Sequence, residues 1–469
     1  MLLTAAIVLP ASAMALPFGI TQEEVDRGAM SIISDRAVSA KAIRKGDDGV
    51  IRLYDVTLSG SDKTLTTDYL ILQPGGGVET GPGRIDMAAE GKGGLSFASS
   101  TYSAADLLER QIGGRSCGSE DRGMDMEPAG EASYVDLIMR TEMGIDVSVA
   151  DETRMGRAEV GFLAGEGADG CLFPEEVGLR DVEVRSADGS RAEIGTLDLS
   201  IGIFGPAGSD LAVEASLADV RARQPDGAEI GAAEQIRLRG SLSPDMVGEL
   251  MRIAELRGSP GFSKELSSVL RKEHLGLRHE IRGAWVNLGI LLGDEQVRKL
   301  GVDPTEQIAI DGGMNATLDK GTLTLEMLND MSGLARGSLR ASFLIAPSDN
   351  AMALAGLAGA VPGIEVLGVM RLAALELDIT DLGLRSKIRA ATGRSASEIV
   401  KQEMTKVRHL PEEIRIAIEA WLEQAEKDGR AYVEMSPIEP VGLLDVGMAA
   451  VMNPKGLGRM LEITTQHPD

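Results

Sequence analysis

Apolar and polar residues alternate along much of this chain, most regularly between Leu179 and Gly240. Successive side chains of a β-strand point to opposite faces, so every second residue shares a face. The segment 196–203 follows this rule, because small or polar residues separate its aliphatic ones. It predicts a strand with one aliphatic face, formed by Leu197, Leu199, Ile201 and Ile203.

A short Leu-x-Asp-Val sequence recurs along the chain. It occurs at 179–182 and 217–220, with a weaker copy at 53–56. After each of the two stronger copies a glycine-containing turn leads into a second alternating segment, which is typical of a β-hairpin. Self-similarity of this kind indicates a repeated supersecondary unit. The recurring aspartates are predicted to be structural, on a polar face or in turns: Asp55, Asp181, Asp219 and Asp381.

These patterns predict an α+β fold, with an elongated, curved antiparallel sheet built from repeated hairpins and helices covering one face. A sheet with one aliphatic face needs cover from helices, a second sheet or a ligand. Cover by the protein's own helices and a lipid-lined groove both remain open. The residues predicted to face a ligand are Leu197, Leu199, Ile201, Ile203, Ile236, Leu238, Ile308, Ile310, Leu323 and Leu325.

The character of the chain changes near Ser243, so we expect a β-rich lobe over 16–242 and an α+β lobe over 243–469. Thr21 is predicted to cap an early helix and Ser397 a later one. The segments 282–292 and 307–318 are expected to be strands.

Composition narrows the possible partners. The chain has 469 residues, and its 47 Lys and Arg against 72 Asp and Glu give a net charge of −25. Such an acidic surface argues against nucleic-acid binding, which needs a basic footprint, and disfavours anionic membrane surfaces. Aromatic residues make up only 3%, so the core must be aliphatic.

The N-terminal residues 1–15 resemble a secretory signal peptide that lacks a charged start, with cleavage expected near Ala13 or Ala15. An uncleaved anchor is the alternative. No later segment reaches the length of a membrane-spanning helix, so the mature chain is expected to contain none. We therefore predict a periplasmic or otherwise exported protein.

Cys117 and Cys171 are the two cysteines of the chain. In an exported protein, two cysteines most economically form one disulfide, which would stabilise the fold by about 4 kcal/mol on the chain-entropy model. Two free thiols in a reducing compartment are the competing interpretation.

No catalytic or cofactor-binding pattern stands out. His274 and His279 are five residues apart, which is not same-face spacing on a helix, and no third ligand lies in pattern with them. The sequence contains no Gly-x-Ser-x-Gly elbow. We therefore expect a protein that is not an enzyme, with no metal and no cofactor.

Two stretches resemble families of the bacterial envelope. Residues 374–465, with Leu377-Asp-Ile-Thr-Asp381, the helix around Trp421 and Pro437-Ile-Glu-Pro440, look like the end of periplasmic proteins of the YdgA type. The Leu-x-Asp-Val hairpins resemble AsmA-like proteins. The resemblance implies an exported protein with an extended amphipathic sheet, and larger AsmA-like proteins are associated with lipid movement.

Together these features suggest a non-enzymatic envelope protein that binds lipid or another apolar ligand along its sheet. The alternative is a periplasmic scaffold that binds other envelope proteins and has a closed core.

Overall fold

The computed structural model describes residues 16–28, 38–60, 63–87, 93–113, 126–142, 150–165, 172–186, 189–204, 210–243, 261–347, 364–406, 412–452 and 457–465, and the single positions 246, 249, 253 and 256. The expected signal peptide, Cys117 and Cys171 lie outside these residues. The chain divides into two compact units, Met1–Gly189 and Ser190–Asp469. The lobe boundary expected at 242/243 falls inside the second unit.

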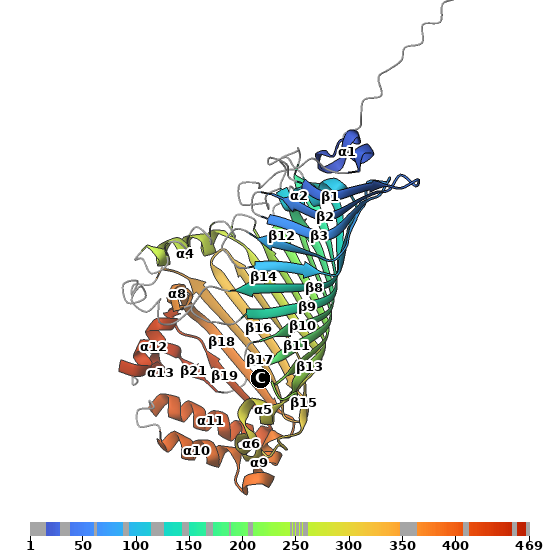
Figure 1. Cartoon of the computed structure of the whole chain (residues 1–469). Helices are drawn as coiled ribbons and strands as arrows, with labels where there is room; N and C mark the ends of the chain where they lie inside the picture. Colours follow the sequence, from blue (N-terminus) through green and yellow to red (C-terminus); the bar gives the residue numbers. More distant parts are fainter. Residues whose placement is uncertain are drawn as a thin grey trace, which may run out of the picture. The chain divides into compact units, whose positions relative to one another are not determined.

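The first unit is an antiparallel sheet with short helices (Figure 1). Strands β1 to β3 pair in chain order, and β8, β9 and β10 form a second meander. Helix α2 (Ala105–Gly113) buries Leu107 and Leu108. The other elements are η1 (Pro17–Gly19), α1 (Gln22–Arg27), β1 (Val38–Lys45), β2 (Ile51–Ser59), β3 (Lys63–Leu72), β4 (Val78–Thr80), β5 (Gly83–Met87), β6 (Gly93–Phe97), β7 (Ser99–Tyr102), β8 (Met126–Glu142), β9 (Ala150–Gly165) and β10 (Leu172–Arg185).

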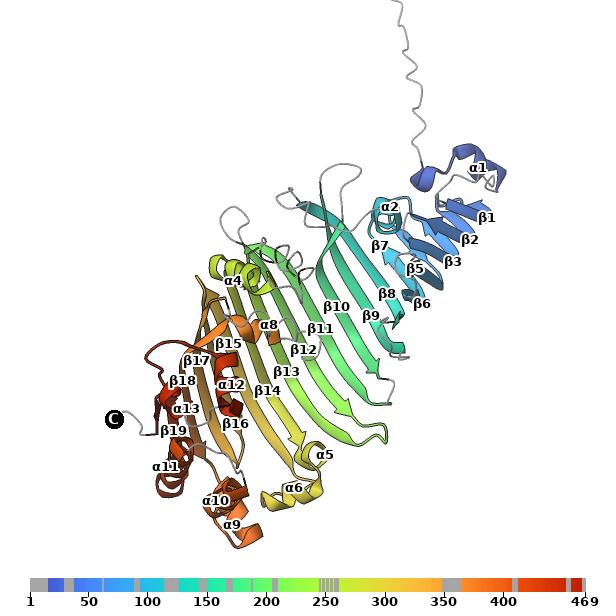
Figure 2. The ribbon, with the colours of Figure 1, turned by 90° about the vertical axis from the view of Figure 1, so that its left-hand side faces the viewer.

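The second unit contains long strands that lie side by side in chain order (Figure 2), each antiparallel to the next from β11 to β19. The strands are β11 (Arg191–Phe204), β12 (Asp210–Arg223), β13 (Glu229–Leu242), β14 (Leu275–Asn287), β15 (Gln307–Asp319), β16 (Thr322–Met331), β17 (Ala335–Ile345), β18 (Met370–Asp381), β19 (Arg430–Met435), β20 (Val441–Gly442) and β21 (Ile463–Thr464). The predicted α+β class, with a curved antiparallel sheet of hairpins, is confirmed.

The helices of the second unit include α4 (Phe262–Lys272), α5 (Leu288–Leu292), α6 (Asp294–Lys299), α8 (Ile364–Val369), α9 (Leu384–Thr392), α10 (Ala396–Lys406), α11 (Glu412–Asp428), α12 (Leu443–Met452) and α13 (Leu457–Leu461). They pack on the sheet through separate clusters. At one end of the strands, Leu266 and Val269 of α4 contact Leu318. At the other end, Leu288 and Val297 cover Ile308. Helices α12 and α13 cover part of β18.

The recurring Leu-x-Asp-Val sequence reverses the alternation of its strand. Leu53 and Val56 are three residues apart, so a regular strand would place them on opposite faces, yet each is only 1% exposed. Asp55 between them has a left-handed φ of 48°. Aspartate is among the few residues other than glycine that visit this region readily. The kink therefore returns both apolar side chains to the same face.

The same kink recurs at Asp181 (φ 52°) and Asp219 (φ 54°), and also at Asp136 (φ 51°). The strand pairing resumes beyond each kink without a change of register: Ala218 pairs with Thr196, and Val220 pairs with Ile194. Asp381 is different, because it lies outside this group of left-handed residues and accepts a hydrogen bond at 3.1 Å from the Arg385 backbone N–H in α9.

Each kinked aspartate in the longer strands faces a glycine of the neighbouring strand. A Cβ added to Gly195 would lie 2.9 Å from the Asp219 Cβ, and one added to Gly156 would lie 3.1 Å from the Asp181 Cβ. Distances near 3 Å are too short for two carbon atoms in contact. The glycine thus makes room for the aspartate.

Of the two predicted helix caps, Thr21 is confirmed and Ser397 is not. Thr21 caps α1 as expected, since its side chain accepts from the Glu24 N–H and Glu24 caps in return. The expectation that Ser397 caps α10 is wrong. Ser395 is the cap, because its Oγ accepts from the Glu398 N–H at 3.2 Å and its own N–H donates to Glu398 Oε2 at 2.8 Å.

The strand expected over 282–292 is partly wrong. Strand β14 begins seven residues earlier, at Leu275, and ends at Asn287. The side chain of Asn287 accepts from the Ile290 N–H at 3.3 Å, which starts the short helix α5. Side-chain capping by asparagine is a common way to begin a helix, so the apolar run 288–292 is helical.

Candidate functional site

Two continuous rows of apolar side chains cross the sheet of the second unit. We call them the central rows. Cross-strand partners align in an antiparallel sheet, and the registers define both rows. The first row is Leu199, Ala215, Leu238, His279, Met314, Met327, Leu339, Leu377 and Val433. The second is Ile201, Val213, Gly240, Leu277, Ala316, Leu325, Ala341, Leu375 and Met435.

The described residues cover the central rows only in part. Ala316 (9% exposed) and Ala341 (4%) are buried, and the other positions of both rows are half-buried. The helical clusters lie beyond them at the two ends of the strands. Near β18 the second row also meets the α12 and α13 cluster at Leu375. From β14 to β16, therefore, an aliphatic strip lies between two helical clusters, and the same rows continue across the neighbouring strands to β11 and β17.

The opposite face of the same strands is polar. The row adjacent to the first central row runs Ser200, Glu214, Arg239, Arg278, Asn315, Glu326, Arg340, Glu376 and Glu434. Arg239 pairs with Glu214 at 2.8 Å, and Arg340 lies 3.8 Å from a carboxylate on each side. Exposed pairs of this kind add little stability. This face is therefore charged and unsuited to apolar molecules, whereas the face with the central rows is apolar.

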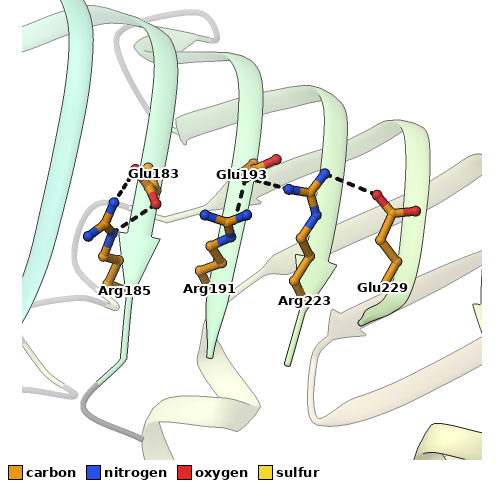
Figure 3. A network of polar contacts seen from close by, with 6 residues as sticks. All are labelled: Glu183, Arg185, Arg191, Glu193, Arg223 and Glu229. Atoms are coloured by element: carbon orange, nitrogen blue, oxygen red, sulfur yellow. Dashed lines mark hydrogen bonds and ion pairs between the residues drawn. The ribbon is translucent and has the colours of Figure 1, made fainter. Parts of the chain in front are cut away.

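Ion pairs also lie at the strand ends, some within one strand and some between neighbouring strands (Figure 3). In the second unit, Glu193 lies 3.4 Å from Arg191 and 3.1 Å from Arg223, and Arg223 lies 3.1 Å from Glu229. In the first unit, Arg185 pairs with Glu183 within β10 at 2.8 Å. Because Arg223 bridges carboxylates from β11 and β13, this network supports the strand register.

The polar face also contains a broad depression of about 1110 Å³ across β14 to β17. Charged residues of both signs line it, including Arg282, Glu280 and Arg340. The hydrogen bond from Arg282 lowers the pKa of Glu280. Positive and negative groups are balanced there, so the depression selects no one charge.

The candidate ligand-facing residues fall into three groups. Leu199, Ile201, Leu238 and Leu325 lie in the central rows, and Leu197 and Ile236 lie one row away on the same face. Ile308 is 2% exposed inside the α5–α6 cluster, Ile310 lies beside Met331 on the same face, and Leu323 packs against the α4 cluster. Ile203 belongs to β11, and its side chain lies outside the described residues.

Sequence reasoning missed part of the strip. His279, Met327, Leu339, Leu377 and Val433 belong to the first central row. His279 was hidden because the strand was expected to begin at 282, although Leu275, Leu277 and Ile281 alternate around it.

No protein-family model matches this chain, and no curated protein matches its sequence. Within the described residues, no helix combines the length and apolar character that crossing a bilayer requires. In the same part of the chain, no three His, Cys, Asp or Glu side chains gather to hold a metal ion. The aliphatic strip is therefore the candidate site.

Proposed function

We propose that this protein is an exported, non-enzymatic envelope protein that binds lipid on the central rows. The observation that carries the proposal is the continuity of the strip: cross-strand neighbours stay apolar from Leu199 in β11 to Leu339 in β17, interrupted only by His279. A half-buried aliphatic surface of this extent is typical of a binding site.

The shape and composition of the strip suit flexible acyl chains. Adjacent strands lie about 4.8 Å apart, so the six spacings from β11 to β17 extend over roughly 29 Å. Met314 and Met327 face each other in the middle of the first row. Methionine adapts its shape to irregular apolar partners, which favours ligands of variable geometry.

The resemblance to YdgA-type and AsmA-like proteins supports the envelope assignment. The alternating strands and the left-handed aspartates form a sheet with one apolar face, as that resemblance implies. A scaffold that binds envelope proteins is the competing function, and the two differ in what occupies the strip.

Native mass spectrometry of protein purified from a bacterial host tests the proposal. We expect co-purified lipid on the wild-type chain and much less on Leu325→Glu, because a carboxylate on the strip costs free energy beside acyl chains. Thr324→Glu is the matched control, since Thr324 is the preceding residue of β16 and faces the polar side.

Circular dichroism must show that both variants fold. Absence of lipid from the wild type, together with no binding of a hydrophobic fluorescent dye, would reject lipid binding and favour the scaffold. Equal lipid loss in Leu325→Glu and Thr324→Glu would place the site elsewhere.

A further inference from the structure

His279 is the exception in the central rows. Every other position of the two rows is aliphatic, methionine or glycine. Its cross-strand partners are Leu238 in β13 and Met314 in β15, and its same-face neighbours within β14 are Leu277 and Ile281. A half-buried imidazole is thus surrounded by apolar side chains.

No hydrogen bond or ion pair joins the side chain of His279 to another described residue, whereas its backbone belongs to the ladder with β13 and β15. The neighbouring charged residues do not satisfy it, because Arg278 and Glu280 precede and follow it in β14 and so point to the opposite face. A polar group among apolar ones costs free energy unless it finds a partner. The imidazole therefore offers an unused donor on an otherwise apolar strip.

We infer that His279 binds the carboxylate of a long-chain fatty acid whose tail lies along the central rows. This inference rests on the proposed function, and it specifies the ligand's head group and position. The charge of the head follows from the surroundings. A cationic head would find no acidic side chain in either row, and a neutral hydroxyl would gain only an ordinary hydrogen bond. A carboxylate can accept a charge-assisted hydrogen bond from the imidazole.

The position of His279 leaves room for the tail. Strand β14 lies three strands from β11 and five from β19 in the pairing order. At about 4.8 Å per strand, the rows extend roughly 14 Å to one side of the imidazole and 24 Å to the other. An extended acyl chain with its head at β14 can therefore follow the first row toward Met327 and Leu339.

Calorimetric titration of the full chain with oleate and with oleyl alcohol tests the inference, since the two ligands share a tail and differ in their heads. We expect wild type to prefer oleate. A hydrogen bond to a charged group contributes about 1.5–3 kcal/mol, so His279→Leu should weaken oleate binding about ten- to hundredfold. Binding of oleyl alcohol should change little.

His274→Leu is the matched control, because His274 is exposed and precedes β14. It should keep the preference of the wild type. If His279→Leu does not fold, His279→Phe replaces it, and we expect the same loss of preference because a phenyl ring has no N–H to donate to the carboxylate.

The outcomes separate the two proposals. If neither ligand binds wild type, the proposed function fails and the inference fails with it. If both bind and the His279 variants keep the wild-type ratio of affinities, the assignment of the carboxylate to His279 is overturned while lipid binding stands. A ratio that falls in His279→Leu and not in His274→Leu supports the inference.

Discussion

The left-handed aspartate at position 219 allows a direct test of how the apolar face is kept continuous. Asp219 has φ 54°, and it lies between Leu217 and Val220, which must share a face. The left-handed region costs an ordinary L-residue about 1–2 kcal/mol, and a β-branched residue is a genuine outlier there. We expect Asp219→Asn to be nearly neutral, whereas Asp219→Val should destabilise the second unit by about 2 kcal/mol.

The facing glycine supplies an independent magnitude. A methyl group at Gly195 would meet the Asp219 Cβ at 2.9 Å and its Oδ2 at 3.2 Å, so Gly195→Ala should destabilise by about 1–3 kcal/mol through overpacking. In an Asp219→Gly background the Cβ is gone, and Gly195→Ala should then cost much less. Residues in contact typically show coupling free energies of about 0.5–3 kcal/mol.

The assay is urea unfolding followed by tryptophan fluorescence. The chain has two tryptophans, and Trp285 in β14 and Trp421 in α11 both belong to the second unit, so the signal reports that unit. The midpoint and slope give the free energy of unfolding. The reasoning is refuted if Asp219→Val is as stable as Asp219→Asn, or if the cost of Gly195→Ala is the same in both backgrounds.

Three further predictions concern other parts of the chain. Ser395→Ala should destabilise the helix it caps by about 1 kcal/mol, whereas Ser397→Ala should cost clearly less; equal shifts of the urea midpoint would contradict the capping assignment. Burial alone would raise the pKa of Asp381, but hydrogen bonds from Arg385 and from backbone N–H groups outweigh it and lower that pKa. Its contribution to stability is therefore present above the ordinary carboxyl pKa, about 3.9, and is lost as pH falls through the lower folded value. Asp381→Asn should accordingly flatten the decline of stability in acid, as thermal unfolding across that range would show. For protein recovered from a bacterial periplasm, thiol titration under denaturing conditions should find no free Cys117 or Cys171; two free thiols would argue against both the disulfide and export.

The sequence revealed the hairpins but not the reason for their spacing. Leu-x-Asp-Val was recognisable as a repeat, since alternation and turn residues are local properties. That Leu217 and Val220 share a face depends on the conformation of Asp219, which a two-residue period does not describe. Apolar residues three apart around an aspartate are the pattern that could have indicated it, and Tyr134-Val135-Asp136-Leu137 is a further example, since Tyr134 and Leu137 are both buried.

The central rows were harder to predict from a single sequence. Single strands showed which residues share a face, but the alignment of Leu238, His279 and Met314 depends on the register between strands. Register is set by bulges as well as by turns. In β14 the pairing with β15 shifts between Ile281 and Ala284, which no hydrophobic pattern reveals. Likewise, the burial of Ile308 follows from α5 and α6 folding over it.

Strands β11 to β17 pair with their neighbours in chain order, which makes this part of the second unit extensible. Because β12 pairs with β11 and β13, and β13 with β12 and β14, duplication of one hairpin would widen the apolar strip by two strand spacings, roughly 10 Å, and leave every other partner in place. Duplication or deletion of a hairpin in the gene would thus change the size of the molecules that the strip accommodates, while the topology stays the same.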